Sequence, residues 1–252
     1  MSIEQPYPEL GEAPPEYPDW VVRPSVITIE GELATGKDAV CEILCRNYGY
    51  RYLEVSGIAR GLTVAFLEER LPRDDEAAIR RFYRDAEVRL DTGGGEVRTI
   101  VNGADVTDRL RDPDTYETSS YLMRYPIVPE SVVRASQTFA RDGNIVMNGR
   151  LLGREVWPGA ELQLFLIADF RTRLGRRFRQ LQGENPDISK GAVERTMRER
   201  EGREAAAGSS IASSWAIIVD TTELSIPRTA ITAVEAHNER MTRLARARRS
   251  RK

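Results

Sequence analysis

The stretch that decides the fold is VITIEGELATGKDAVC, residues 26–41. Its first four residues are a short apolar, β-branched run, which is typical of a buried parallel strand. Residues 31–37 follow with the spacing G-x-x-x-x-G-K, and from residue 37 to 47 apolar residues recur at helical spacing before Gly49. A glycine loop between a strand and a helix is the setting of a phosphate-binding P-loop.

This loop predicts a nucleotide site. Its glycines allow backbone N–H groups to turn toward a phosphate, and the start of the following helix adds partial positive charge. Lys37 is expected to reach the β- and γ-phosphates of ATP as a point charge. We therefore expect the whole loop to contact the nucleotide: Gly31, Glu32, Leu33, Ala34, Thr35, Gly36, Lys37, Asp38 and Ala39. A glycine turn with a purely structural role is the alternative.

The residue after the lysine departs from the motif. Asp38 stands where a P-loop usually carries the serine or threonine hydroxyl that binds Mg²⁺. A carboxylate at this place either binds Mg²⁺ more strongly or repels the phosphates. We predict Asp38 as the metal ligand, and its effect on catalysis stays open.

Further short apolar runs predict the rest of the fold. They begin near residues 52, 145, 162 and 215, and helical stretches lie between them. This alternation predicts an α/β protein, a P-loop type with a five-stranded parallel sheet flanked by helices. Residues 87–107 alternate apolar and polar side chains around two glycine turns, at 93–95 and at 102–103, which predicts a small antiparallel β insert. Residues 176–208, rich in arginine and glutamate, predict a solvated, mobile helical lid.

Composition and the chain ends bound the function. We expect a proline-rich arm over residues 1–24, one P-loop domain over 25–239 and a basic tail over 240–252, where seven residues are basic. A net charge of −2 does not favour a nucleic-acid binder, although an RNA-binding role for the basic tail is an alternative. The N-terminus lacks the pattern of a signal peptide and no run is long enough to cross a membrane, so we expect a cytoplasmic monomer.

The two cysteines predict no metal centre. Cys41 and Cys45 lie four residues apart in the helix predicted after the P-loop, and His237 is the only histidine. A zinc site would be short of ligands, so we expect both cysteines in the core.

Six stretches of the chain resemble cytidylate kinases, in the order and at the spacing of that family. Residues 27–37 are similar to its first strand and P-loop, and residues 52–60 resemble "YLDTGAMYR". The later stretches are 101–111, 148–160, 164–177 and 219–222, which resemble "NGxDVTxxIR", "DGRDIGTVVFPDA", "FLTASxxxRAxRR" and "IDTT". The resemblance as a whole runs from about residue 26 to 235.

The resemblance implies a phosphotransferase that moves the γ-phosphate of ATP to CMP or dCMP, with Mg²⁺. Catalysis would consist of positioning and charge neutralisation. The implied catalytic residues are Lys37, Arg176, Arg177 and Arg200, and the implied substrate-binding residues are Arg60, Arg150, Arg203 and Glu204. Closure of the lid would exclude water and prevent wasteful hydrolysis of ATP.

The departures from the family pattern gather at the acceptor end. Leu151 replaces the aspartate of "GRD", and Pro129 stands where the family has an arginine. In the lid, the last arginine of "RDxxDxxR" is Ala207, and in the second stretch the hydroxyl of the "TG" pair is displaced to Ser56. Three hypotheses therefore stay open: an active (d)CMP kinase, a kinase of the same fold for another small acceptor, and a degenerate kinase that binds nucleotide or a partner without catalysis.

Overall fold

The computed structural model describes residues 24–91, 97–206, 208 and 211–249. The expected arm up to residue 23, the glycine turn at 93–95, residue Ala207 and the last three residues of the basic tail lie outside the described residues. Within the described part, no helix is both long and apolar enough to span a bilayer.

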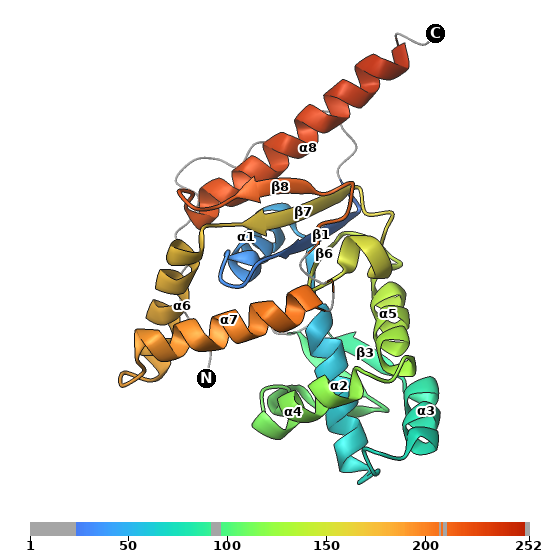
Figure 1. Ribbon diagram of the computed structural model, residues 1–252. Coiled ribbons are helices and arrows are strands. Elements are labelled where there is room, and N and C mark those ends of the chain that lie inside the picture. Colours follow the sequence, from blue (N-terminus) through green and yellow to red (C-terminus); the bar gives the residue numbers. More distant parts are fainter. Residues whose placement is uncertain (1–23, 92–96, 207, 209–210, 250–252) are drawn as a thin grey trace.

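A five-stranded parallel sheet forms the centre of the molecule (Figure 1). Its strands are β1 (Val26–Gly31), β2 (Arg51–Glu54), β6 (Ile145–Asn148), β7 (Leu162–Ile167) and β8 (Ile217–Asp220), in the spatial order β2-β6-β1-β7-β8. Every pairing between these strands is parallel. The predicted fold class is therefore confirmed. β8 begins two residues later than its apolar run, because Trp215 is exposed in a turn before it.

Helices cover both faces of this sheet, because side chains alternate between the faces along each strand. In β6, Ile145 and Met147 join one hydrophobic cluster and Val146 joins the other. The first cluster is completed by α2 (Val55–Glu68) and α5 (Ile127–Ala140). The second is completed by α1 (Lys37–Tyr48) and α8 (Ile226–Arg249), whose far end continues beyond the sheet (Figure 1).

The cysteines belong to this second cluster, as the sequence predicts. Cys41 is buried within it and Cys45 packs against it, and both are free thiols. The described residues contain no group of three or more metal-ligating side chains.

The chain segment that connects β2 to β6 forms a smaller lobe. It consists of α2 and α5, with α3 (Glu76–Asp85), the 3₁₀ turn η1 (Thr107–Arg109) and α4 (Pro113–Leu122). It also contains the predicted antiparallel insert, β3 (Val88–Asp91), β4 (Arg98–Val101) and β5 (Ala104–Asp105), paired in that order. Edge-to-face contacts between the rings of Phe66, Phe82 and Tyr83 lie in its core.

Two further helices form a hairpin next to the P-loop. They are α6 (Phe170–Glu184) and α7 (Lys190–Ala206), so the helical segment starts six residues before the expected lid boundary at 176. Asp169 caps α6 by accepting a hydrogen bond from the Thr172 N–H at 2.9 Å, and this sets the earlier start. The hairpin has a small core of its own, against which Leu33 of the P-loop packs.

Candidate functional site

The P-loop lies at the carboxyl end of β1 and adopts a backbone that requires its glycines. Gly31, Ala34 and Gly36 all have positive φ, at 136°, 62° and 92°. A Cβ at Gly31 would lie 2.1 Å from the carbonyl oxygen of Leu166, and one at Gly36 would lie 2.5 Å from Ile226. The sheet backbone therefore leaves no room for a side chain at Gly31, and at Gly36 the Ile226 side chain of α8 would have to shift.

Most side chains of the loop form hydrogen bonds or packing contacts with other parts of the protein. The Glu32 carboxylate accepts the N–H of Ala168 at 3.1 Å, and the buried Thr35 hydroxyl donates to the carbonyl of Glu32 at 2.9 Å. Leu33 packs on the α6–α7 hairpin, and Ala39 is buried in α1. A ligand at this loop would thus meet backbone groups and Lys37 rather than these side chains.

Two cations converge on one carbonyl oxygen of the loop. The Lys37 ammonium donates to the carbonyl of Gly31 at 3.0 Å and to that of Glu32 at 2.6 Å. The Arg150 guanidinium donates to the same Gly31 carbonyl at 3.0 Å. Burial, followed by the charge of Arg150, lowers the pKa of Lys37 to about 8. Two adjacent cations that share one carbonyl oxygen are a candidate site for an anion such as a phosphate.

A buried carboxylate holds the turn that carries Arg150. Glu30 is 3% exposed and accepts the N–H groups of Leu152 and Gly153, each at 3.0 Å. Burial raises the pKa of Glu30, and these hydrogen bonds and Arg150 partly oppose the rise. Leu151 has a left-handed backbone conformation, with φ 56°, which is uncommon for a leucine. The hydrogen bonds to Glu30 offset the cost of this conformation. The position of Arg150 is therefore set by a residue of β1, about 120 positions away in sequence.

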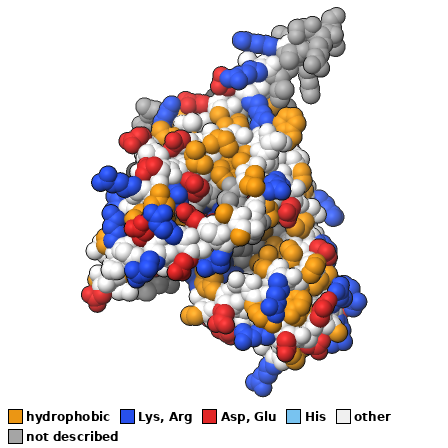
Figure 2. Space-filling model, in the orientation of Figure 1, with side chains coloured by type: hydrophobic (Ala, Val, Ile, Leu, Met, Phe, Trp, Pro, Cys, Tyr) orange, Lys and Arg blue, Asp and Glu red, His pale blue; other side chains and the backbone are white. Residues whose placement is uncertain are grey.

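The α6–α7 hairpin reaches this site through α7. The Glu204 carboxylate pairs with Arg150 at 2.6 Å and with Arg200 at 2.9 Å. Burial lowers the pKa of Arg150, as does Arg200, while Glu204 raises it. In Figure 2, charged side chains of both signs crowd this region, and the surface is hollowed between α7 and the smaller lobe.

Arg173 was missed in the sequence. It is buried on α6, pairs with Glu32 of the P-loop at 3.2 Å and with Glu201 of α7, and so joins the hairpin to the loop. The available signal was its place one helical turn before Arg176 in the "RAxRR"-like stretch.

The other three hairpin arginines that the sequence predicted for the site lie in different settings. Arg176 donates to the carbonyl and the hydroxyl of Thr221 at 2.6 and 3.1 Å, and burial lowers its pKa. Arg177 donates to Gln180 on its own helix at 2.8 Å, and Arg203 is exposed on α7. The described contacts therefore bring Arg200 to the Lys37–Arg150 group, while Arg177 and Arg203 do not join it in this arrangement.

Asp38 lies on the open side of the loop with two polar neighbours. It is exposed and accepts hydrogen bonds from the Asn148 amide and, at 3.4 Å, from the Tyr52 hydroxyl. The amide oxygen of Asn148 is buried without a hydrogen-bond partner. Burial, and then the charges near it, raise the pKa of Tyr52, so this hydroxyl stays a neutral donor.

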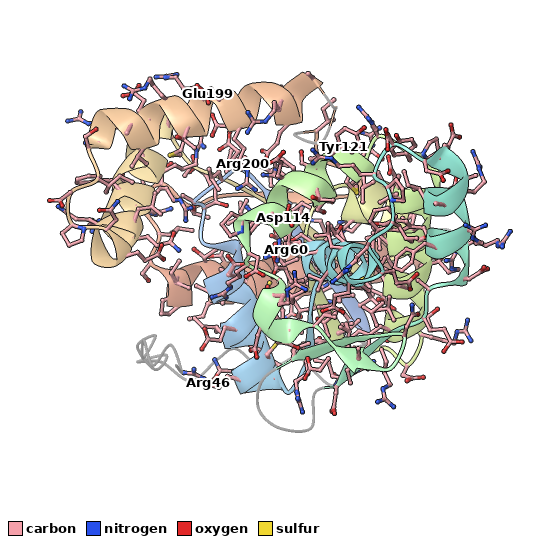
Figure 3. The ribbon with its side chains drawn as sticks, turned by 90° about the horizontal axis from the view of Figure 1, so that it is seen from below. Arg46, Arg60, Asp114, Tyr121, Glu199 and Arg200 are labelled. Carbon is pink, nitrogen blue, oxygen red and sulfur yellow. The ribbon has the colours of Figure 1, made fainter. Side chains whose placement is uncertain are left out.

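Arg60 of α2 forms a second cationic position, in the smaller lobe. Its guanidinium pairs with Glu54 at 2.9 Å, donates to Ser56 at 3.0 Å and lies 5.2 Å from the centre of the Tyr116 ring. Burial alone would raise the pKa of Glu54, but Arg60 and Ser56 outweigh it and lower that pKa. Figure 3 labels Arg60 on α2 and Asp114 on α4, the two helices that meet at this ring contact, and Arg200 on α7.

The fold and the loop define a P-loop α/β protein of the nucleoside monophosphate kinase type, with a smaller lobe and a helical hairpin flanking the loop. Comparison with known proteins gives the family. The model of the cytidylate kinase family matches residues 27–239, and the chain therefore belongs to that family.

Relatives of known name agree with this assignment. The chain is 31% identical over 202 residues to the cytidylate kinase of Carboxydothermus hydrogenoformans, covering 79% of this chain and 91% of that protein. It is 30% identical over 217 residues to the cytidylate kinase of Geobacillus sp. strain WCH70, covering 85% and 97%. Among solved structures, TT1252 from Thermus thermophilus aligns over 85% of this chain and 98% of its own, with a TM-score of 0.40 and 20% identity.

Proposed function

We propose that this protein transfers the γ-phosphate of ATP to a nucleoside monophosphate, with CMP and dCMP as the first candidates. The observation that carries the proposal is the convergence of Lys37 and Arg150 on the Gly31 carbonyl, beside Arg200 of α7. Transfer of a phosphoryl group needs little covalent work from the protein, since positioning and charge neutralisation supply most of the acceleration. Family membership supports the same class of reaction.

Each cation has a role in this proposal. Lys37 and the loop backbone bind the β- and γ-phosphates, and Arg60 grips the phosphate of the acceptor from the smaller lobe. Arg150, beside Lys37 at the Gly31 carbonyl, would contact the transferred group, and Arg200 and Arg176 would close the site from the hairpin. Arg177 and Arg203 would have to swing inward to share in that role. The guanidinium of Arg150 is paired with the Glu204 carboxylate, so a phosphate that binds Arg150 must displace that carboxylate.

Mg²⁺ fits the residues beside the loop. The exposed Asp38 carboxylate offers the hard oxygen ligand that Mg²⁺ prefers. The Asn148 amide donates its N–H to Asp38 and has an oxygen without a hydrogen-bond partner, so turning this amide would supply a second oxygen ligand. When bound, Mg²⁺ would neutralise part of the phosphate charge. Asp38 is therefore proposed as a ligand rather than as an obstacle to ATP.

The test is nucleotide-dependent consumption of ATP. Purified protein with Mg²⁺ is assayed against CMP, dCMP, UMP, dUMP, AMP and GMP, and Lys37→Ala controls for a contaminating kinase. The proposal predicts turnover with CMP or dCMP that the variant abolishes. Turnover with none of the six, at concentrations where ATP binds, would overturn it.

A second candidate is a kinase of the same fold for a different small acceptor. It is favoured by Leu151 and Pro129, which place apolar side chains where the family motifs have polar ones. Under this candidate, ATP turnover depends on Lys37 but requires an acceptor outside the cytidine nucleotides. If ATP binds and no acceptor supports turnover, the hypothesis of a degenerate kinase that only binds nucleotide replaces both kinase hypotheses.

A further inference from the structure

A tyrosine of the smaller lobe lies against Arg60, the proposed acceptor-binding residue, and belongs to none of the six family-like stretches. Tyr116 lies on α4, two residues after Asp114, and 50% of its surface is exposed. Its neighbours on the other side of α4 are buried: Thr115, Thr118, Ser119 and Leu122. The helix therefore packs through small and apolar side chains and leaves this aromatic ring outside the core.

The ring covers the guanidinium of Arg60. The centre of the ring lies 5.2 Å from the Arg60 guanidinium carbon, within the range of a cation–π contact. Glu54 and Ser56 hold the same guanidinium, whose side chain is only 13% exposed. Arg60 is thus fixed by three partners, while half of the Tyr116 surface stays exposed to solvent.

An exposed aromatic face beside a fixed cation suits a ligand that carries a phosphate and a ring. A nucleoside monophosphate carries its base one sugar away from its phosphate, so a phosphate gripped by Arg60 brings the base within reach of Tyr116. Every nucleobase has a π-face, and stacking on an aromatic side chain is therefore tolerant of base identity.

We propose that Tyr116 is a substrate-binding residue that stacks on the base of the acceptor, so that the site takes nucleoside monophosphates by phosphate grip and stacking and discriminates weakly between bases. This inference rests on the proposed function. It differs from a structural role, in which Tyr116 only holds Arg60 in place.

Equilibrium titrations of the full chain separate these roles. The ligands are CMP, UMP, AMP and ribose 5-phosphate, which keeps the sugar and phosphate but lacks the base. In Tyr116→Leu, affinity for each nucleotide should fall about 10- to 100-fold, while affinity for ribose 5-phosphate stays within about twofold. Tyr116→Phe should keep the wild-type affinities, because the ring remains.

The chain offers a matched control on the same helix. Tyr121 lies near the other end of α4, and its ring stacks with Arg124 at 3.5 Å. Tyr121→Leu removes a comparable ring–arginine contact away from Arg60 and should leave all four affinities unchanged. Thermal unfolding of each variant checks that the fold is kept.

Three outcomes would overturn the inference. The first is an equal loss for ribose 5-phosphate in Tyr116→Leu, which would mean that Tyr116 acts only through Arg60. The second is the same nucleotide loss in Tyr121→Leu. The third is wild-type protein that binds nucleotides no more tightly than ribose 5-phosphate. Failure of turnover alongside the predicted affinity pattern would instead reject the proposed reaction and leave the stacking role standing.

Discussion

The lowered pKa of Lys37 predicts a pH dependence of ATP binding. Burial and the charge of Arg150 bring this pKa to about 8, so the ammonium loses its proton as the pH rises through 8 rather than in the usual range for lysine. Only the charged form attracts the phosphates. The attraction is therefore complete below about pH 7 and is lost progressively above pH 8.

The magnitude follows from the fraction of charged lysine. With a pKa of about 8, roughly nine tenths of Lys37 is protonated at pH 7 and roughly one tenth at pH 9. If binding requires the proton, affinity for ATP should fall about tenfold between these values, which corresponds to about 1.4 kcal/mol. ATP itself is fully ionised over most of this range, so its own charge contributes little.

The assay is calorimetric titration of Mg²⁺–ATP into the protein at several pH values and constant ionic strength, since salt screens phosphate contacts. Lys37→Arg is the matched control, because a guanidinium keeps its charge throughout and should give a nearly flat profile. A flat profile for the wild type, or the same slope in the arginine variant, would show that Lys37 does not titrate as its surroundings imply.

Three further predictions test the loop and its support. Gly31→Ala should lower the free energy of unfolding in urea by about 2–5 kcal/mol, because its Cβ would overlap the Leu166 carbonyl. The control is Gly175→Ala, whose Cβ would meet nothing within 4 Å and which should stabilise the protein by about 0.5–1 kcal/mol. Equal effects of the two substitutions would contradict the geometry. Glu30→Ala should cost about 2–4 kcal/mol, since two backbone N–H groups lose their acceptor, and it should weaken phosphate binding; unchanged stability would show that water replaces the carboxylate. Asp38→Ala should raise the Mg²⁺ concentration for half-maximal turnover about tenfold or more, and an unchanged Mg²⁺ titration would remove Asp38 from the metal site.

Local signals in the sequence determined the P-loop and the layered fold. Residues 26–41 carry strand, glycine turn and helix start within one short stretch, and each of these depends on neighbours in the chain. The buried runs of the other strands and the helical spacing between them predicted the parallel sheet in the same way. Gly49 ended α1 as predicted, because its φ of 68° suits a helix C-terminus.

The motifs also located several residues of the candidate site, but not their contacts. Lys37, Arg150 and Arg200 were expected from the resemblance, and the structure brings them together around the Gly31 carbonyl and Glu204. Arg177 and Arg203 carry the same motif signal, yet the described contacts do not bring them to this group: Arg177 binds Gln180 on its own helix and Arg203 is exposed. A motif specifies which residue type stands at a position, whereas the direction of its side chain depends on the packing of its helix.

Only the tertiary structure decided which distant groups meet. Parallel strands bring their carboxyl ends to one edge of the sheet, and this places Arg150 against the P-loop and Glu30 beneath the turn at Leu151. Packing of α4 on α2 sets Tyr116 over Arg60, and packing of α6 sets Arg173 against Glu32. The residues of these pairs are separated by about 50 to 140 positions in the chain, so no local sequence pattern predicts their contacts. Their contacts depend on the order in which strands and helices pack, which is a property of the whole fold.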